Sequence, residues 1–211
     1  MSFRIGVLVS GEGSNLQALI DTVHGRGGME IVCVGSNNPD ARALARAEAA
    51  GIETGRFPAG SYGSREERDA VLASWLGERR VELVVLAGFM EVLGPAYIRR
   101  FRGHTVNVHP SLLPAFPGVH AIDQALAQGV RLMGVTVHFV DEGVDSGPII
   151  AQEAFDPVTY SRDIAAVERR VHEIEHRLLP RVVRLIAAGR VRIDPENPRS
   201  VIVDEDGVGD D

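Results

Sequence analysis

A polar pair interrupts one of the apolar stretches of this sequence. Asn107 and His109 stand two residues apart in residues 105–109, a run that otherwise reads as a buried β-strand, and Pro110 follows it. Side chains alternate between the faces of a strand, so both point to the same side. Open α/β sheets bind their ligands at the carboxyl ends of their strands. The pair therefore predicts a polar crevice there, the alternative being a strand that frays into a polar loop.

Two loops carry further polar signals. Residues 10–15 read Ser-Gly-Glu-Gly-Ser-Asn between an apolar run and a helical pattern. A glycine-rich turn before a helix exposes backbone N–H groups that suit a phosphate, although the loop lacks G-x-G-x-x-G and could be a plain tight turn. Glu12 must point away from such an anion. In residues 141–148, Gly147-Pro148 restrains Asp145, which meets His109 if this loop folds over the end of the sheet.

Helical and strand-like patterns alternate over the first 110 residues, which predicts a mostly parallel sheet covered by helices. Ser14 and Ser64 each begin an S-x-x-Q/E capping box. The expected strands cover residues 5–10, 31–36, 53–57, 83–87 and 105–109, and the expected helices cover residues 14–23, 41–50, 65–80 and 95–101.

The remaining half of the chain predicts a helix over 122–128 and two strands, 134–140 and 149–155, that pair antiparallel. Ser161 should cap a long helix that Pro180 kinks or divides. The apolar stripe of this helix comprises Ile164, Val167, Val171, Ile174, Leu178, Val182 and Leu185. We expect one domain over residues 1–203 and a disordered acidic tail over 204–211.

Composition excludes several classes of function. The chain has 211 residues and a net charge of −7, which argues against a dedicated binder of nucleic acid or of a membrane surface. All 22 basic residues are arginine, so lysine-based chemistry is excluded. The single cysteine, Cys33, is expected to be an inert core thiol in a cytoplasmic protein.

Four motifs in this order resemble the phosphoribosylglycinamide formyltransferases, a family of folate-dependent enzymes. They are residues 10–17, 87–90, 107–114 and 145–150, and the likeness covers about residues 3–193. It implies a single-domain, Rossmann-like formyltransferase fold with an antiparallel strand towards its C-terminal half. It also implies 10-formyltetrahydrofolate as the donor co-substrate, glycinamide ribonucleotide as the acceptor, and a cis Leu113–Pro114 peptide, and it leaves a homodimer open.

The resemblance also implies roles for individual residues. The ribonucleotide contacts would be Gly13, Ser14, Asn15, His172 and Glu175. The folate contacts would be Arg65, Met90, Glu91, Val92, Leu93, Asn107, Asp141, Glu142, Gly143, Val144 and Asp145. Glu12 and Glu91 depart from the family pattern.

The chemistry of formyl transfer suits three of these residues independently. Attack of an amine on a formyl carbon creates a tetrahedral oxyanion, to which the Asn107 amide and a protonated His109 can donate hydrogen bonds. Asp145 would favour the imidazolium form and hold a water that relays the proton. We therefore expect Asn107, His109 and Asp145 to be catalytic, without a metal ion. Ser111 is expected to be structural, and His104, His120 and His138 to be surface or core residues.

Three other functions compete with this interpretation. A methionyl-tRNA formyltransferase would carry a further tRNA-binding domain, and a formyltetrahydrofolate hydrolase would carry a domain before the core. A non-catalytic nucleotide-binding module would keep the phosphate loop and would not need Asn107, His109 and Asp145 together. Deformylation assays with and without glycinamide ribonucleotide distinguish these alternatives.

Overall fold

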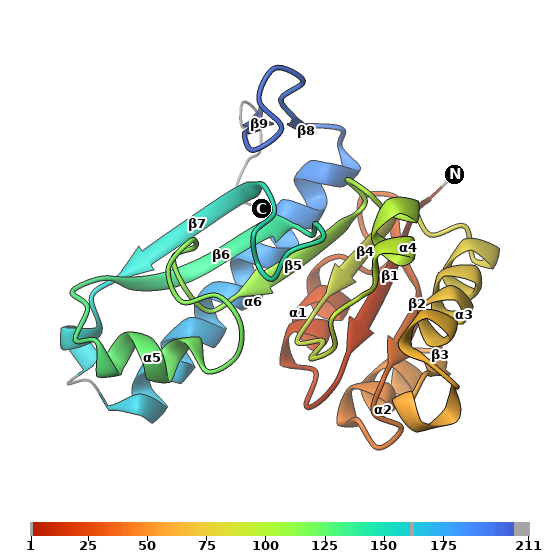
Figure 1. Cartoon of the computed structure of the whole chain (residues 1–211), viewed down its shortest axis with the longest axis horizontal. Helices are drawn as coiled ribbons and strands as arrows, with labels where there is room; N and C mark the ends of the chain where they lie inside the picture. Colours follow the sequence, from red (N-terminus) through yellow and green to blue (C-terminus); the bar gives the residue numbers. More distant parts are fainter. Residues whose placement is uncertain (1, 161–162, 205–211) are drawn as a thin grey trace.

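The computed structural model describes residues 2–160 and 163–204. They form three layers, a seven-stranded sheet with helices on each of its two faces (Figure 1). The strand order is β3-β2-β1-β4-β5-β6-β7. Its strands are β1 (Phe3–Val9), β2 (Met29–Ser36), β3 (Glu53–Arg56), β4 (Leu83–Leu86), β5 (Thr105–His109), β6 (Met133–Phe139) and β7 (Ile149–Phe155). Strands β1 to β5 pair parallel, whereas β6 pairs antiparallel with both neighbours. This confirms the predicted sheet and its antiparallel strand.

Two apolar cores lie on opposite faces of this sheet. The larger core packs against α1 (Ser14–Thr22), α2 (Arg42–Ala49), α5 (Ala121–Ala127) and α6 (Ile164–Ala187). The smaller core packs against α3 (Arg65–Glu78) and α4 (Pro95–Arg100). The chain order reverses between β1 and β4, so the loops after these two strands separate at a topological switch point, where open α/β sheets bind ligands.

Two predicted helix caps are wrong, although α1 begins at Ser14 as expected. Gly13, not Ser14, is the N-cap of α1; it has a φ of 78°, and no side chain in the described part of the molecule caps the helix. The N-cap of α6 is Asp163, whose carboxylate accepts a hydrogen bond from the Ala166 N–H, and Ser161 lies outside the described residues. The cap at Ser64 is confirmed, since its hydroxyl accepts from the Glu67 N–H at 3.1 Å.

Helix α6 continues through Pro180 without being divided. Residues on both sides of the proline, such as Leu179 and Val182, are fully buried, so packing against the sheet holds the helix together despite the missing N–H donor. Of the predicted apolar stripe, Ile164 is 43% exposed and the other members are buried.

A small antiparallel hairpin that the sequence patterns did not predict follows α6. It consists of β8 (Val191–Ile193) and β9 (Val201–Val203), and Figure 1 shows it projecting from the end of α6. Asp204 is held there, because its N–H donates to the Arg190 carbonyl and its carboxylate lies 2.9 Å from Arg192. The rest of the predicted tail, 205–211, lies outside the described residues. No helix within the described chain is long and apolar enough to span a membrane.

Candidate active site

Strand β5 presents its polar pair at the edge of a cavity. Val106 and Val108 are buried in the larger core, and the opposite face carries Asn107 and His109, as the alternation predicts. His109 is itself 4% exposed, so its ring is held within the protein rather than in solvent. The chain then turns at the cis Leu113–Pro114 peptide that the resemblance implies.

The loop after β6 brings Asp145 to this pair. One carboxylate oxygen, Oδ2, lies 3.3 Å from Nδ1 of His109 and accepts a 2.8 Å hydrogen bond from the Gly118 N–H. The other, Oδ1, accepts a 3.2 Å hydrogen bond from the Asn107 amide. The three side chains that the chemistry singled out therefore lie in direct contact.

Burial raises the pKa of the Asp145 carboxyl. Contacts with His138 and the Gly118 N–H, together with the positive charge of a protonated His109, lower it by a larger amount. The pKa of Asp145 therefore lies below its usual value. Asp145 is thus a fixed negative charge beside His109. It adopts a φ of 49°, in the left-handed region that aspartate tolerates better than most residues.

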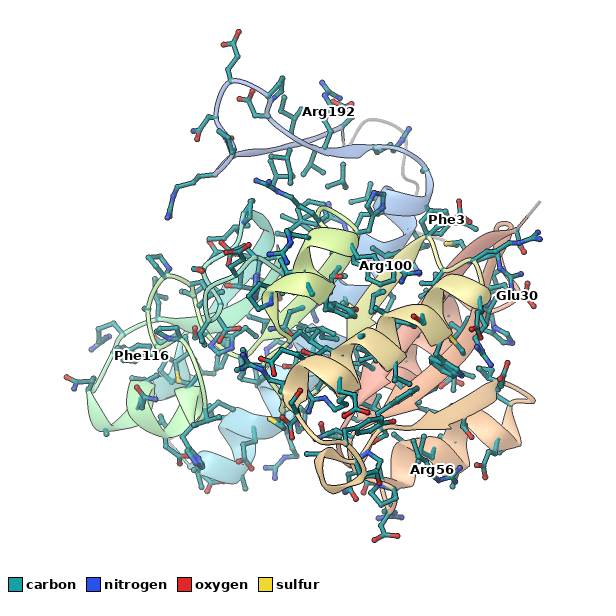
Figure 2. All side chains as sticks on the ribbon, turned by 45° about the vertical axis from the view of Figure 1, so that its right-hand side comes forward. Phe3, Glu30, Arg56, Arg100, Phe116 and Arg192 are labelled. Carbon is teal, nitrogen blue, oxygen red and sulfur yellow. The ribbon has the colours of Figure 1, made fainter. Side chains whose placement is uncertain are left out.

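Both nitrogens of the His109 ring have protein partners. Nδ1 faces Asp145, and Nε2 lies 2.8 Å from the Phe116 carbonyl, which can only accept a hydrogen bond. Nε2 therefore carries a proton. Phe116 lies on the segment between β5 and α5, where Figure 2 labels it. A substrate oxygen can bond to this N–H only by exchanging with that carbonyl.

His138, expected to be a surface or core residue, is buried and also belongs to this cluster. It stands opposite Asn107 in the antiparallel register of β5 and β6, and its Nε2 lies 3.3 Å from the Asn107 amide nitrogen. Its Nδ1 donates to the Phe139 carbonyl at 2.8 Å, and its Nε2 also lies 3.6 Å from the Asp145 carboxylate. The local signal was weak, because His138 is one of two polar residues, with Thr136, in an otherwise apolar strand.

The cluster opens into a cavity of about 580 Å³ with largely apolar walls. Nine of the predicted folate contacts line it, namely Met90, Glu91, Val92, Leu93, Asn107, Asp141, Gly143, Val144 and Asp145. Arg65 and Glu142 do not line it, although the Arg65 guanidinium lies beside Gly94 at the end of the Met90–Leu93 wall. His120, expected to be a surface or core residue, also lines it.

The predicted ribonucleotide contacts form a second cluster outside this cavity. The Asn15 amide donates to the Glu175 carboxylate at 2.9 Å, which joins α1 to α6, and the Asn15 oxygen is buried without a hydrogen-bond partner among the described residues. Burial raises the pKa of Glu175 despite this hydrogen bond and the positive charge of His172. His172, one turn before Glu175, is exposed.

Glu12 points away from this second cluster, as a phosphate site requires. Its carboxylate lies 3.0 Å from both Arg42 and Arg46, and Arg46 also donates to the Glu12 carbonyl at 2.9 Å. The pairs neutralise the charge of Glu12. Among the described residues, no group of three or more histidine, cysteine, aspartate or glutamate side chains could hold a metal ion.

Known proteins resemble the whole of this arrangement. The formyl transferase family model matches residues 3–183. Phosphoribosylglycinamide formyltransferase of Haemophilus influenzae is 40% identical over 191 residues, which cover 90% of each chain. A solved structure of glycinamide ribonucleotide transformylase 1 from Symbiobacterium toebii superposes with a TM-score of 0.90 at 43% identity, covering 96% of this chain and 94% of that one.

A trifunctional purine biosynthetic protein of Drosophila melanogaster is 45% identical over 196 residues, and this chain spans 14% of its length. The Haemophilus and Symbiobacterium proteins, in contrast, match over nearly their full length. The chain has the Asn107–His109–Asp145 cluster and the glycine-rich loop, and it resembles these enzymes over nearly its full length. It belongs to the formyl transferase family and is a relative of the phosphoribosylglycinamide formyltransferases.

Proposed function

We propose that this protein transfers the formyl group of 10-formyltetrahydrofolate to the amine of glycinamide ribonucleotide. The contact of Asn107, His109 and Asp145 at one end of an apolar cavity is the observation that carries the proposal. A folate of this kind combines an aromatic benzoyl ring, which suits apolar walls, with a pterin ring whose N–H and C=O edges require polar partners. The cluster at Asn15 and Glu175, beside the N-terminus of α1, would hold the ribonucleotide.

The reaction requires one bond to form and one to break at the formyl carbon. The amine nitrogen attacks this carbon, the oxygen becomes an oxyanion, and the bond to the donor nitrogen then breaks. The Asn107 amide and the Nε2–H of His109 would donate to the oxyanion, the latter by exchanging with the Phe116 carbonyl. Asp145 would stabilise the charged ring and hold a water that carries the proton from the amine to the leaving nitrogen.

The test measures loss of the formyl group from 10-formyltetrahydrofolate by the purified protein. We expect turnover only when glycinamide ribonucleotide is present, because the attacking nucleophile is its amine. Rapid turnover with water alone would instead identify a hydrolase, and formylation of methionyl-tRNA would identify a different transferase. Either result would overturn the proposal.

A further inference from the structure

The wall segment 88–94, of which residues 88–93 line the cavity, is held from behind by a buried arginine that the proposed reaction does not use. Arg68 lies on α3, which crosses the front of the molecule in Figure 2, and is 1% exposed. It donates twice to one oxygen of Asp69, at 2.8 and 3.0 Å, and its third nitrogen lies 2.9 Å from Glu91. The other Asp69 oxygen accepts from the Gly94 N–H at 2.6 Å.

This arrangement attaches the wall at two points. Glu91 is bound directly by Arg68, and Gly94 is bound through Asp69. A guanidinium taken out of water needs partners for its charge and its N–H groups, and removing one partner of such a buried network is far more costly than breaking an exposed ion pair. The wall segment between these points is therefore held in one position.

The same network continues to the glycine-rich loop. The second oxygen of Glu91 accepts from the Asn37 amide at 3.4 Å, and the Asn37 oxygen accepts from the Ser10 hydroxyl at 2.5 Å. The Ser10 oxygen in turn accepts from the Met90 N–H at 2.8 Å. Both oxygens of Glu91 thus have protein partners, so its side chain is committed to the wall.

We propose that Arg68, Glu91 and Asn37 are positioning residues that join the wall 88–94 to the loop that begins at Ser10. The inference rests on the proposed function, in which the wall contacts the formyl donor and the loop contacts the ribonucleotide phosphate. It assigns Glu91 a role behind the donor site in place of the direct folate contact that the resemblance implies. Displacement of either segment is transmitted to the other, so the two substrates bind cooperatively.

The test uses Glu91→Ala, Asn37→Ala and the double variant. Asn37 is not among the residues that line the cavity, so its effect on the donor cannot be the loss of a direct contact. We expect each single change to raise KM for 10-formyltetrahydrofolate by about tenfold, as for members of one hydrogen-bonded network, with a smaller change in kcat. The double variant should be little worse than either single one.

Two matched variants complete the experiment. Glu91→Gln keeps one oxygen for Arg68 but sets an NH2 donor against the Asn37 amide donor, so it should raise KM for the donor about as much as Asn37→Ala does. Glu53→Ala removes another glutamate–arginine pair, with Arg79, at the far edge of the sheet and should leave both KM values unchanged. Tetrahydrofolate binding, measured by calorimetry with and without glycinamide ribonucleotide, reports the cooperativity, which Asn37→Ala should reduce.

The proposal is overturned if Asn37→Ala behaves like Glu53→Ala, or if the effects of the two single changes multiply in the double variant. A fall in melting temperature at unchanged KM would show that the network is only structural. If the wild-type protein shows no ribonucleotide-dependent transfer, the proposed function fails instead, and the binding measurements with tetrahydrofolate still test the network.

Discussion

Replacing Asp145 by asparagine removes one charge beside His109 and keeps the shape of the side chain. The carboxylate lies 3.3 Å from Nδ1 of His109, and the two side chains are 14% and 6% exposed. Opposite charges at this separation interact by about 5 kcal/mol at an effective dielectric constant of ~20. This value is an upper limit on what the charge of Asp145 contributes to a protonated His109 during the reaction.

We expect kcat of Asp145→Asn to fall by ~10²–10⁴, the range for acid–base assistance. That loss corresponds to about 3–5.5 kcal/mol of activation free energy, and the electrostatic limit of about 5 kcal/mol covers all but the top of this range. KM for both substrates should change little, because the interaction is made mainly in the transition state. Asparagine tolerates the left-handed φ of 49°, and its amide oxygen can still accept from the Gly118 N–H, so the loop should keep its shape.

Steady-state kinetics with a parallel melting curve test this expectation. The control is Asp156→Asn, whose carboxylate accepts a 2.8 Å hydrogen bond from the Val158 N–H outside the cavity. If Asp145→Asn keeps kcat within a few-fold of wild type and lowers the melting temperature, Asp145 only shapes the loop, and the reasoning above is refuted.

Three further predictions concern stability and reactivity. Gly13→Ala should lose about 2 kcal/mol or more of unfolding free energy in urea titrations, because φ is 78° and the new Cβ would lie 2.5 Å from that of Ala43. Gly11→Ala has open space around it and should lose little. Equal losses in the two variants would contradict this prediction. Because the pKa of Asp145 is lower in the folded protein, its ionised carboxylate stabilises the fold fully above about pH 3.9, the pKa of aspartate in the unfolded chain. This stabilisation is lost as the pH falls through the pKa of the folded state. The difference in unfolding free energy between wild type and Asp145→Asn should therefore shrink in that range. Burial raises the pKa of Cys33 to about 12, so a disulfide reagent at pH 8 should label no thiol in the folded protein and one after denaturation; fast labelling of the native state would show that the core opens.

Local patterns in the sequence were sufficient for most of the elements. Strand β5 has the predicted bounds, because alternation along one strand is a property of consecutive residues. The cap at Ser64 was predicted correctly because a side chain and an N–H three residues later are close in any helix. The same pattern at Ser14 was misleading, since Gly13 enters α1 in a left-handed conformation against Ala43, a residue of the neighbouring helix.

Both local sequence patterns and the tertiary structure were needed to identify the site. Motif order identified Asn107, His109 and Asp145. Their contact, however, depends on the fold of the loop after β6, which brings Asp145 to Asn107 although the two residues are 38 positions apart in the sequence. The local signal at His138 was weak, and only the antiparallel register of β6 sets it opposite Asn107. The burial of Arg68 was likewise invisible, because a charged residue in a helix pattern predicts a solvated face unless distant partners are known. Sequence alone therefore determined the elements and the chemical groups, through contacts that span a few residues. Tertiary structure decided which groups meet, because pairings between distant strands and loops depend on the topology of the whole sheet.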